Sequence, residues 1–306
     1  MQTQKFFNVG LTLDTDYTQL NEFLLEYAPY IKEVYFSLPL GERFQTRSHI
    51  GRQFENAATV ALFWDMLALI KRFDIRLELV LNTYHLSEND VACAAKMLQE
   101  RKVDVDSVCV LDEYYAWAVR YFPNKEYVFS YNNGLKRLED IRAVKNRYDY
   151  FVVGNCNIRN NELISYLHGE GIKPILLVNN GCSFHCNCCK SSRLCKEVFE
   201  RNLQTYGLDY LYAEQSLFPC ELQDGFVHTS LVDMLKISNR SSPIPYLKKC
   251  IDSYSGNRVL KYIEESAENF SLWGRLGHFW PLFKDINLQK VIEHKQRIWG
   301  KELPLQ

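Results

Sequence analysis

The sequence predicts an α/β fold, a (β/α)₈ TIM-like barrel that is irregular in places and has C-terminal closing helices. Apolar runs of strand length alternate along the chain with stretches whose apolar residues recur at helical spacing. This pattern is typical of right-handed βαβ units and a parallel sheet. About eight such units in 306 residues fit a barrel better than an open doubly wound sheet. No glycine-rich phosphate fingerprint follows the first predicted strand, which disfavours the dinucleotide-binding alternative.

The predicted elements follow one another in a regular order. The strands are expected at Phe6–Leu13, Ile31–Leu38, Ile75–Leu81, Ser107–Leu111, Tyr127–Tyr131, Tyr148–Gly154, Ile172–Val178 and Met234–Ser238, with a further short candidate at Tyr210–Ala213. The amphipathic helices are expected at Ala57–Phe73, Glu88–Arg101, Leu135–Asn146, Glu162–His168 and Ile244–Tyr254.

We interpret residues 1–306 as a single barrel domain, because no internal repeat, low-complexity segment or Pro/Ser-rich linker marks a boundary. The tail 271–306 is predicted to be a helical extension that packs across the barrel. Its aromatic residues are Trp273, Phe279, Trp280, Phe283 and Trp299.

Composition and charge indicate a globular, cytoplasmic protein. The chain is 47% hydrophobic and 24% charged, which supplies a large core. Its formal net charge of -1 gives no general attraction to nucleic acid or membranes. No apolar run approaches the roughly 18 residues of a membrane span, and no targeting segment is recognisable at the start. Ten cysteines in a reducing compartment favour metal binding over a disulfide framework.

Six of the predicted strands end in polar residues. In such a barrel the active site forms where strands run into the following loops, so these tips should meet at one mouth. A single Asn or Gly at a strand end usually just makes a turn, but the whole set favours a polar pocket. The tips are Asn82–His85, Asp112–Glu113, Ser130–Asn133, Gly154–Asn155, Asn179–Gly181 and Ser238–Arg240.

Four residues of these tips are candidates for catalysis. His85, Asp112 and Glu113 are candidates for proton transfer, because histidine titrates near neutral pH and burial raises the pKa of a carboxyl. For His85 a purely structural role in a turn stays open. Arg240 is a candidate for bidentate binding of a substrate carboxylate.

A dense group of cysteines follows the seventh predicted strand, at the expected mouth. Neighbouring thiolates repel one another unless a cation binds them, so this segment is predicted to be a metal site. Its members are Cys182, Cys186, Cys188 and Cys189, with Cys195 and Cys220 as further candidates downstream. The remaining cysteines have apolar contexts and are predicted to be small buried hydrophobes: Cys93, Cys109, Cys156 and Cys250.

Two metals compete for this site. Zinc prefers paired thiolates or thiolate–imidazole mixtures, which Cys182 and Cys186, with Cys189 and either Cys220 or His185, would supply. A 4Fe–4S cluster usually takes a close group of thiolates plus a distant one, which fits Cys220 better. We therefore favour a 4Fe–4S cluster, with zinc as the runner-up and a plain thiol cluster third. Spacing leaves Cys188 and Cys189 as alternative ligands.

Three motifs in order resemble the U-32 peptidase (collagenase-like) family. The chain is similar to its small single-barrel iron–sulfur members, such as the oxygen-independent ubiquinone-hydroxylation proteins. The first motif is the strand that ends in Asn180-Gly181-Cys182, and the second is the isolated Cys220. The third is Lys236-Ile-x-x-Arg240, which leads into a helix ending in Ser253-Tyr254; Asn239 replaces the glycine usual before the arginine.

The resemblance implies a 4Fe–4S cluster on Cys182, Cys186, Cys189 and Cys220. It also implies cofactor-binding roles for Asn180 and Lys236, and an Arg240 that faces the same pocket. Relatives act in oxygen-independent hydroxylation of quinone precursors or nucleobases, with prephenate as oxygen donor, and some work as heterodimers. The partners it implies are therefore a small-molecule substrate, such as a prephenate-like dicarboxylate, and a homologous subunit. No peptidase motif supports proteolysis.

Three alternatives stay beside this hypothesis. A non-catalytic, cluster-bearing or redox-sensing partner protein is compatible with a cluster that has four thiolate ligands. The Cys182-x₃-Cys186-x₂-Cys189 spacing resembles radical-SAM enzymes, but it follows the seventh strand, and Cys220 would close the iron which that chemistry needs open. Basic residues after the cysteines fit a solvated helix face better than an RNA site.

Overall fold

A closed barrel of eight parallel strands forms the centre of the molecule. The structure is a computed structural model. It describes residues 6–11, 13, 15–41, 44, 54–133, 138–154, 157–178, 192–215, 217, 221–222, 226–238, 243–256 and 287–300. The strands pair in chain order and β8 returns to β1, which confirms the predicted TIM-like barrel. They are β1 (Phe7–Gly10), β2 (Ile31–Phe36), β3 (Arg76–Leu81), β4 (Ser107–Val110), β5 (Glu126–Phe129), β6 (Tyr150–Val153), β7 (Lys173–Leu177) and β8 (Met234–Ile237).

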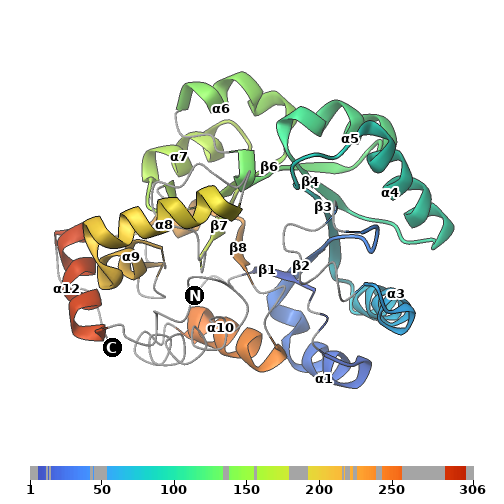
Figure 1. Cartoon of the computed structure of the whole chain (residues 1–306), viewed down its shortest axis with the longest axis horizontal. Helices are drawn as coiled ribbons and strands as arrows, with labels where there is room; N and C mark the ends of the chain where they lie inside the picture. The colour runs from blue at the N-terminus through green and yellow to red at the C-terminus, as the bar shows by residue number, and fades with distance from the viewer. Residues whose placement is uncertain are drawn as a thin grey trace.

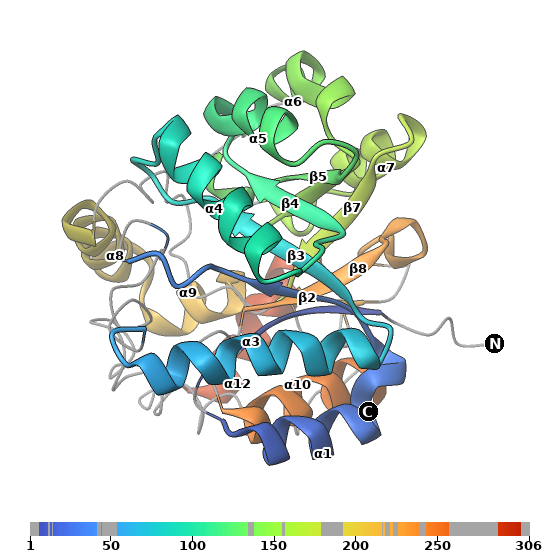
Figure 2. The ribbon, with the colours of Figure 1, turned by 90° about the vertical axis from the view of Figure 1, so that its right-hand side faces the viewer.

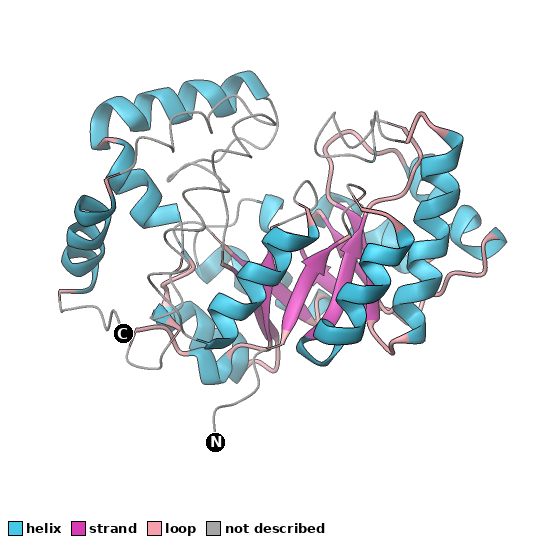
Figure 3. Ribbon diagram, turned by 90° about the horizontal axis from the view of Figure 1, so that it is seen from below, coloured by secondary structure: helices cyan, strands magenta, loops and turns pink. Residues whose placement is uncertain are grey.

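Helices surround the strands (Figure 3). Those between successive strands are α1 (Tyr17–Tyr27), α3 (Ala57–Arg72), α4 (Glu88–Glu100), α5 (Tyr115–Tyr121), α6 (Leu138–Val144) and α7 (Asn161–Gly169). The connection from β7 to β8 carries α8 (Ser192–Tyr206) and α9 (Leu208–Gln215), and α10 (Ile244–Gly256) and α12 (Leu288–Trp299) follow β8. Short 3-10 turns include η3 (Asp112–Tyr114), η4 (Tyr131–Asn133) and η5 (Lys145–Arg147). Figure 1 shows α8, α9 and α12 grouped on one side of the molecule.

Strand alternation divides the core into two parts. Successive side chains of a strand point to opposite faces, so Phe7 and Val9 face the helices while Asn8 faces the lumen. The outer part packs strands against helices. A separate inner cluster fills much of the lumen, and its buried members are Tyr35, Val80, Cys109, Val128, Tyr150, Val152, Ile175, Leu177 and Met234.

Helix α1 begins at a capping box that the periodicity of the sequence did not reveal. The Asp16 carboxylate accepts a hydrogen bond from the Gln19 backbone N–H at 2.8 Å, and the Gln19 side chain accepts one from the Asp16 N–H at 3.3 Å. The helix buries Phe23 and Tyr27, and it lies beside α10 (Figure 2), where Tyr27 donates a hydrogen bond to Asp252 at 3.1 Å.

Two predictions about local structure are wrong. The candidate strand Tyr210–Ala213 lies inside α9, where the Tyr210 ring stacks on Tyr206, the last residue of α8. A short apolar run cannot be assigned to strand or helix by pattern alone. Cys93 is exposed rather than buried, because α4 turns Val91, Ala94 and Leu98 toward the core instead. Cys109 and Cys250 are buried as predicted, and Cys156 lies outside the described residues.

The described part of the C-terminal tail is the single helix α12. The Asn287 side chain caps its first turn, and Gly300 ends it with φ 62°, a left-handed conformation that favours glycine. The helix packs against α9, and its Lys295 side chain is fully buried there. Among the residues that the structure describes, no helix is both long and apolar enough to cross a membrane.

Candidate active site in the barrel lumen

One side of the barrel lumen is lined by polar and charged residues. Asn8, Glu33 and Glu78 come from β1, β2 and β3, and they are buried at 0%, 1% and 0% exposure. Ser107 of β4 and Lys236 of β8 complete the group. TIM-barrel interiors are usually filled by branched apolar side chains, so this composition is unusual for the fold.

The side chains of this lumen cluster form a connected network. The Asn8 amide Nδ2 donates to Glu33 Oε2 at 2.7 Å and to Glu78 Oε2 at 3.0 Å. Ser107 Oγ donates to Glu33 Oε1 at 2.7 Å, and Lys236 Nζ donates to Glu78 Oε1 at 2.6 Å. The Lys236 ammonium also lies 4.1 Å from the centroid of the Tyr35 ring, a favourable cation–π position. Asn8 Oδ1, in contrast, is buried without a hydrogen-bond partner among the described residues.

Burial separates the protonation states of these groups. Burial, and then the nearby Glu78 carboxylate, raise the pKa of Glu33 to about 7, because two carboxylates in one dry site cannot both ionise freely. Burial alone would lower the pKa of Lys236, but the Glu78 carboxylate beside it outweighs burial and raises it. Burial, and then Glu78, raise the pKa of Cys109 to about 12, so this residue is a thiol rather than a thiolate. Lys236 is therefore an ammonium group at neutral pH, whereas Glu33, whose pKa is about 7, gains or loses its proton in this range.

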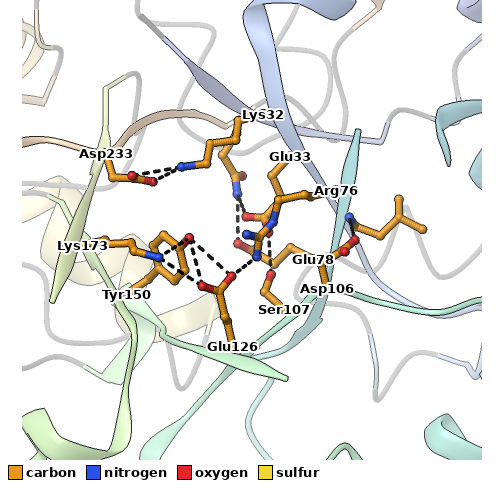
Figure 4. A network of polar contacts seen from close by, with 12 residues as sticks. Lys32, Glu33, Arg76, Glu78, Asp106, Ser107, Glu126, Tyr150, Lys173 and Asp233 are labelled. Atoms are coloured by element: carbon orange, nitrogen blue, oxygen red, sulfur yellow. Dashed lines mark hydrogen bonds and ion pairs between the residues drawn. The ribbon is translucent and has the colours of Figure 1, made fainter. Parts of the chain in front are cut away.

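A second ionic group lies where the strands begin (Figure 4). Arg76 forms an ion pair with Glu126, and Lys173 Nζ lies 3.1 Å from Glu126 Oε1 and 3.2 Å from the Tyr150 hydroxyl. Burial by itself would raise the pKa of Glu126, but hydrogen bonds from Arg76 and Lys173 outweigh it and lower the pKa. Arg76 Nε lies 3.5 Å from Glu33 Oε1, which links this group to the lumen cluster.

Polar strand tips meet at the opposite end, where the strands finish. Asn82, after β3, donates through Nδ2 to Ser130 Oγ at 3.0 Å, and the Asn132 amide donates back to the Asn82 carbonyl at 3.1 Å. The Tyr84 hydroxyl donates to the Asn132 carbonyl at 2.6 Å. Asn82 Oδ1 is buried without a partner among the described residues. The Asp112 N–H also donates to Asn133 Oδ1 at 2.7 Å, so the structure brings three of the predicted polar tips together at the mouth.

The predicted proton-transfer residues lie away from the lumen cluster. His85 is exposed and adopts φ 79°, two residues before the N-cap Ser87 of α4. Asp112, in η3, accepts hydrogen bonds from Arg147 at 3.0 Å and from the Tyr148 hydroxyl at 2.9 Å. Glu113 is exposed. Catalytic roles for these three residues stay predictions.

The predicted metal ligands Cys182, Cys186, Cys189 and Cys220 lie outside the described residues, as do Asn180 and Arg240. The chain that flanks them is described. Val178 and Leu217 are joined by a backbone hydrogen bond of 3.0 Å, from the Leu217 N–H to the Val178 carbonyl. The buried Tyr254 hydroxyl donates to the carbonyls of Leu217 at 2.9 Å and Val178 at 3.3 Å. Across the ranges that the structure describes, no three His, Cys, Asp or Glu side chains gather as a metal site.

Glu221, the residue after Cys220, is bonded by the side chains of Arg159 and of the buried Lys295. Arg159 Nε donates to Glu221 Oε1 at 2.8 Å, and Lys295 Nζ of α12 donates to Glu221 Oε2 at 2.6 Å. Burial would raise the pKa of Glu221, but Arg159 and then Lys295 outweigh it and lower the pKa to about 2. The helix α12 is therefore tied directly to the chain beside Cys220.

Of the lumen cluster, the sequence had indicated only Lys236. A usable signal was present: Asn8, Glu33 and Glu78 are polar residues inside otherwise apolar predicted strands. A strand buried on both faces is normally an almost continuous apolar run. A carboxylate in its middle therefore indicates a polar lumen.

No family model matches the sequence, and no curated protein matches it either. Among solved structures, a U32 peptidase is 12% identical, with a TM-score of 0.49 over 79% of this chain and 96% of that chain. A conserved protein from Enterococcus faecalis is 12% identical, with a TM-score of 0.44 over 83% and 67% of the two chains. A tryptophan synthase complex from Pyrococcus furiosus is 12% identical, with a TM-score of 0.42 over 82% and 98%. Likenesses this distant do not bear on the activity of this chain.

Proposed function

We propose that this chain is a U-32 peptidase-like protein that holds a 4Fe–4S cluster on Cys182, Cys186, Cys189 and Cys220. In this proposal it acts as an oxygen-independent hydroxylase or related redox tailoring enzyme on an aromatic or nucleobase substrate, alone or with a homologous subunit. The sequence motifs suggest the family. The observation that carries the metal site is the hydrogen bond between Val178 and Leu217.

This hydrogen bond supports a shared site because of chain reach. A chain spans at most about 3.5 Å per residue, so Cys182 lies within about 14 Å of Val178 and Cys220 within about 11 Å of Leu217. The two cysteine segments therefore leave the described fold from adjacent points. Tyr254 bonds both departure points, and Glu221 anchors the far side of Cys220. In this proposal the four thiolates meet near these departure points, an arrangement that would suit an iron–sulfur cluster or zinc.

The chemistry divides between the bound group and the protein. A 4Fe–4S cluster, when bound, supplies one-electron transfer. The protein's own residues would orient the substrate at the mouth, where Asn82, Ser130 and Asn132 already form a polar rim. In this proposal Arg240 binds a substrate carboxylate, as a dicarboxylate such as prephenate requires, and His85, Asp112 or Glu113 move protons. Hydroxylation replaces a C–H bond by C–OH and removes two electrons from the substrate, and in this proposal the organic donor both supplies the oxygen atom and accepts these two electrons.

Anaerobic purification tests the metal. We expect a brown protein that absorbs broadly at about 400 nm and contains about four irons per chain. Cys220→Ala should lower the iron content, while Cys93→Ala, which changes an exposed cysteine on α4, should leave it unchanged. A colourless protein with stoichiometric zinc contradicts the cluster. If Cys220→Ala keeps its full iron content, the fourth ligand is another residue, such as Cys188 or Cys195.

Activity tests the reaction separately. The iron-loaded protein is incubated without oxygen with an aromatic substrate and prephenate, and the hydroxylated product is measured by mass spectrometry. Turnover by the chain alone supports an enzyme. Turnover only when a homologous subunit is added supports the partner role, and product whose oxygen derives from labelled water contradicts the donor assignment.

A further inference from the structure

The Lys236 ammonium has hydrogen-bonding capacity that its surroundings do not use. An ammonium group carries three N–H donors, and among the described residues Glu78 Oε1 is its one hydrogen-bond acceptor. The Tyr35 ring covers a further side of the ammonium without accepting a conventional hydrogen bond. A buried donor without an acceptor is destabilising, and more so when it is charged. An acceptor from outside the protein would remove this cost.

Lys236 also lies near the mouth end of the barrel, and its side chain is not completely buried. It lies next to the C-terminal end of β8, and its register partners are Asn8 of β1 and Leu177 of β7. The side chain of Lys236 retains 10% exposure, whereas its partner Glu78 is fully buried. In β/α barrels this end of the strands forms the active-site mouth. Lys236 thus lies at the boundary between solvent and the closed lumen cluster.

The charge balance of the lumen favours an anion at this point. The charged side chains that face inward from the strands are the cations Lys236, Arg76 and Lys173 and the carboxylates Glu78, Glu126 and Glu33. With a proton on Glu33, three cations face two carboxylates, which leaves one positive charge. With Glu33 ionised the balance is zero. The protonated lumen is therefore complementary to one added negative charge.

We propose that the Lys236 ammonium is an anion-binding group at the floor of the barrel mouth, and that it binds the carboxylate of a small organic acid. Glu78 and the Tyr35 ring cover two sides of the ammonium, so one side is left for a carboxylate oxygen, and such a charge-assisted hydrogen bond is stronger than a neutral one. In this proposal Lys236 binds the substrate, whereas the family resemblance implied that it binds the cofactor. The claim that the bound carboxylate belongs to the substrate rests on the proposed function. The claim that a carboxylate binds at Lys236 rests on the geometry of the lumen alone.

This binding is coupled to protons through Glu33. The charged groups that face Glu33 are Glu78, Arg76 and Lys236, and Ser107 and Asn8 bond it as neutral partners. An added anion disfavours a second ionised carboxylate beside it, so carboxylate binding should draw a proton onto Glu33. Its pKa of about 7 places this coupling between pH 6 and pH 8. Affinity for a carboxylate should therefore fall as the pH rises through this range.

Acetate, which stays ionised over this pH range, is the probe. Line broadening of ¹³C-acetate is measured by NMR on the full-length protein, with sodium chloride of equal ionic strength as the reference. We expect saturable acetate binding that weakens several-fold from pH 6 to pH 8. In Glu78→Gln/Lys236→Met, which removes both charges together and so avoids a lone buried carboxylate, binding should weaken about tenfold or more. In Glu33→Gln the affinity should no longer depend on pH.

Lys248→Met is the matched control, because Lys248 is a lysine on α10 that pairs with the exposed Glu26 at 2.9 Å. It should bind acetate like the wild type. Wild-type protein without saturable binding, or a double variant that binds acetate as tightly as the wild type, overturns the proposal. The iron content of the same samples is measured, so loss of the cluster is distinguished from loss of the anion site.

Discussion

Replacing the buried Glu33 by glutamine should stabilise the protein at alkaline pH. Glu33 is 1% exposed, and its pKa is about 7 in the folded protein against an ordinary 4.5. A carboxyl whose folded pKa is raised holds its proton to higher pH than in the unfolded chain. The contribution of Glu33 to the stability of the fold is therefore greatest below about pH 4.5 and is lost as the pH rises through about 7. Glutamine carries no charge, so the stability of Glu33→Gln should not fall with pH for this reason.

The expected magnitude follows from the two pKa values. With these two values, the free energy of unfolding is lower by about 3 kcal/mol at pH 8, and by about 1 kcal/mol at pH 5, than it is at low pH where Glu33 is protonated in both states. The amide keeps the existing partners, because a glutamine oxygen can accept from Asn8 while its NH₂ donates to the Ser107 hydroxyl. Equilibrium urea unfolding of the wild type and Glu33→Gln at pH 5 and pH 8 measures the difference.

Glu126→Gln is the control with the opposite sign. Hydrogen bonds from Arg76 and Lys173 lower the pKa of Glu126, so its charge stabilises the fold and the glutamine variant should lose stability at pH 8. That loss should shrink as the pH falls and the wild-type carboxylate is protonated. The reasoning on Glu33 is refuted if Glu33→Gln is less stable than the wild type at pH 8, or if both proteins show the same pH dependence.

Two further predictions concern ion pairs outside the lumen. Lys295→Met should lower the free energy of unfolding by about 3–5 kcal/mol, because it leaves the fully buried Glu221 with one cation fewer, whereas Lys290→Met on the exposed face of α12 should have little effect. Equal urea midpoints for these two variants would contradict a buried pair that holds α12 in place. Asp112→Asn should cost about 1 kcal/mol, because its partner Arg147 is largely exposed and only the Tyr148 hydrogen bond is shielded. Glu113→Gln is its exposed control in thermal unfolding, and loss of turnover in Asp112→Asn with unchanged stability would instead support the predicted proton-transfer role.

Local sequence pattern was sufficient for most of the architecture. Seven of the eight strands fall within the predicted runs and β5 begins one residue earlier, at Glu126, because the interior of a parallel barrel requires apolar segments with amphipathic helices between them. The prediction of secondary structure failed where the same short apolar pattern fits both a strand and a helix. The pattern of Tyr210–Ala213 fits a strand, but in the fold these residues lie in α9, where Leu211 and Ala213 are buried. The exposure of Cys93 likewise depends on which face of α4 meets the core.

The sequence by itself determined the barrel and the dense cysteine segment after its seventh strand, because both follow from patterns among residues that lie close together in the chain. Only the tertiary structure brought Asn8, Glu33, Glu78 and Lys236 into one network, because these residues come from four strands and are separated by up to 228 positions in the chain. Their polarity was visible in the strands, but their mutual distances were not. The raised pKa of Glu33 and the unused donors of Lys236 arise from those distances and from burial, which only the closed barrel provides.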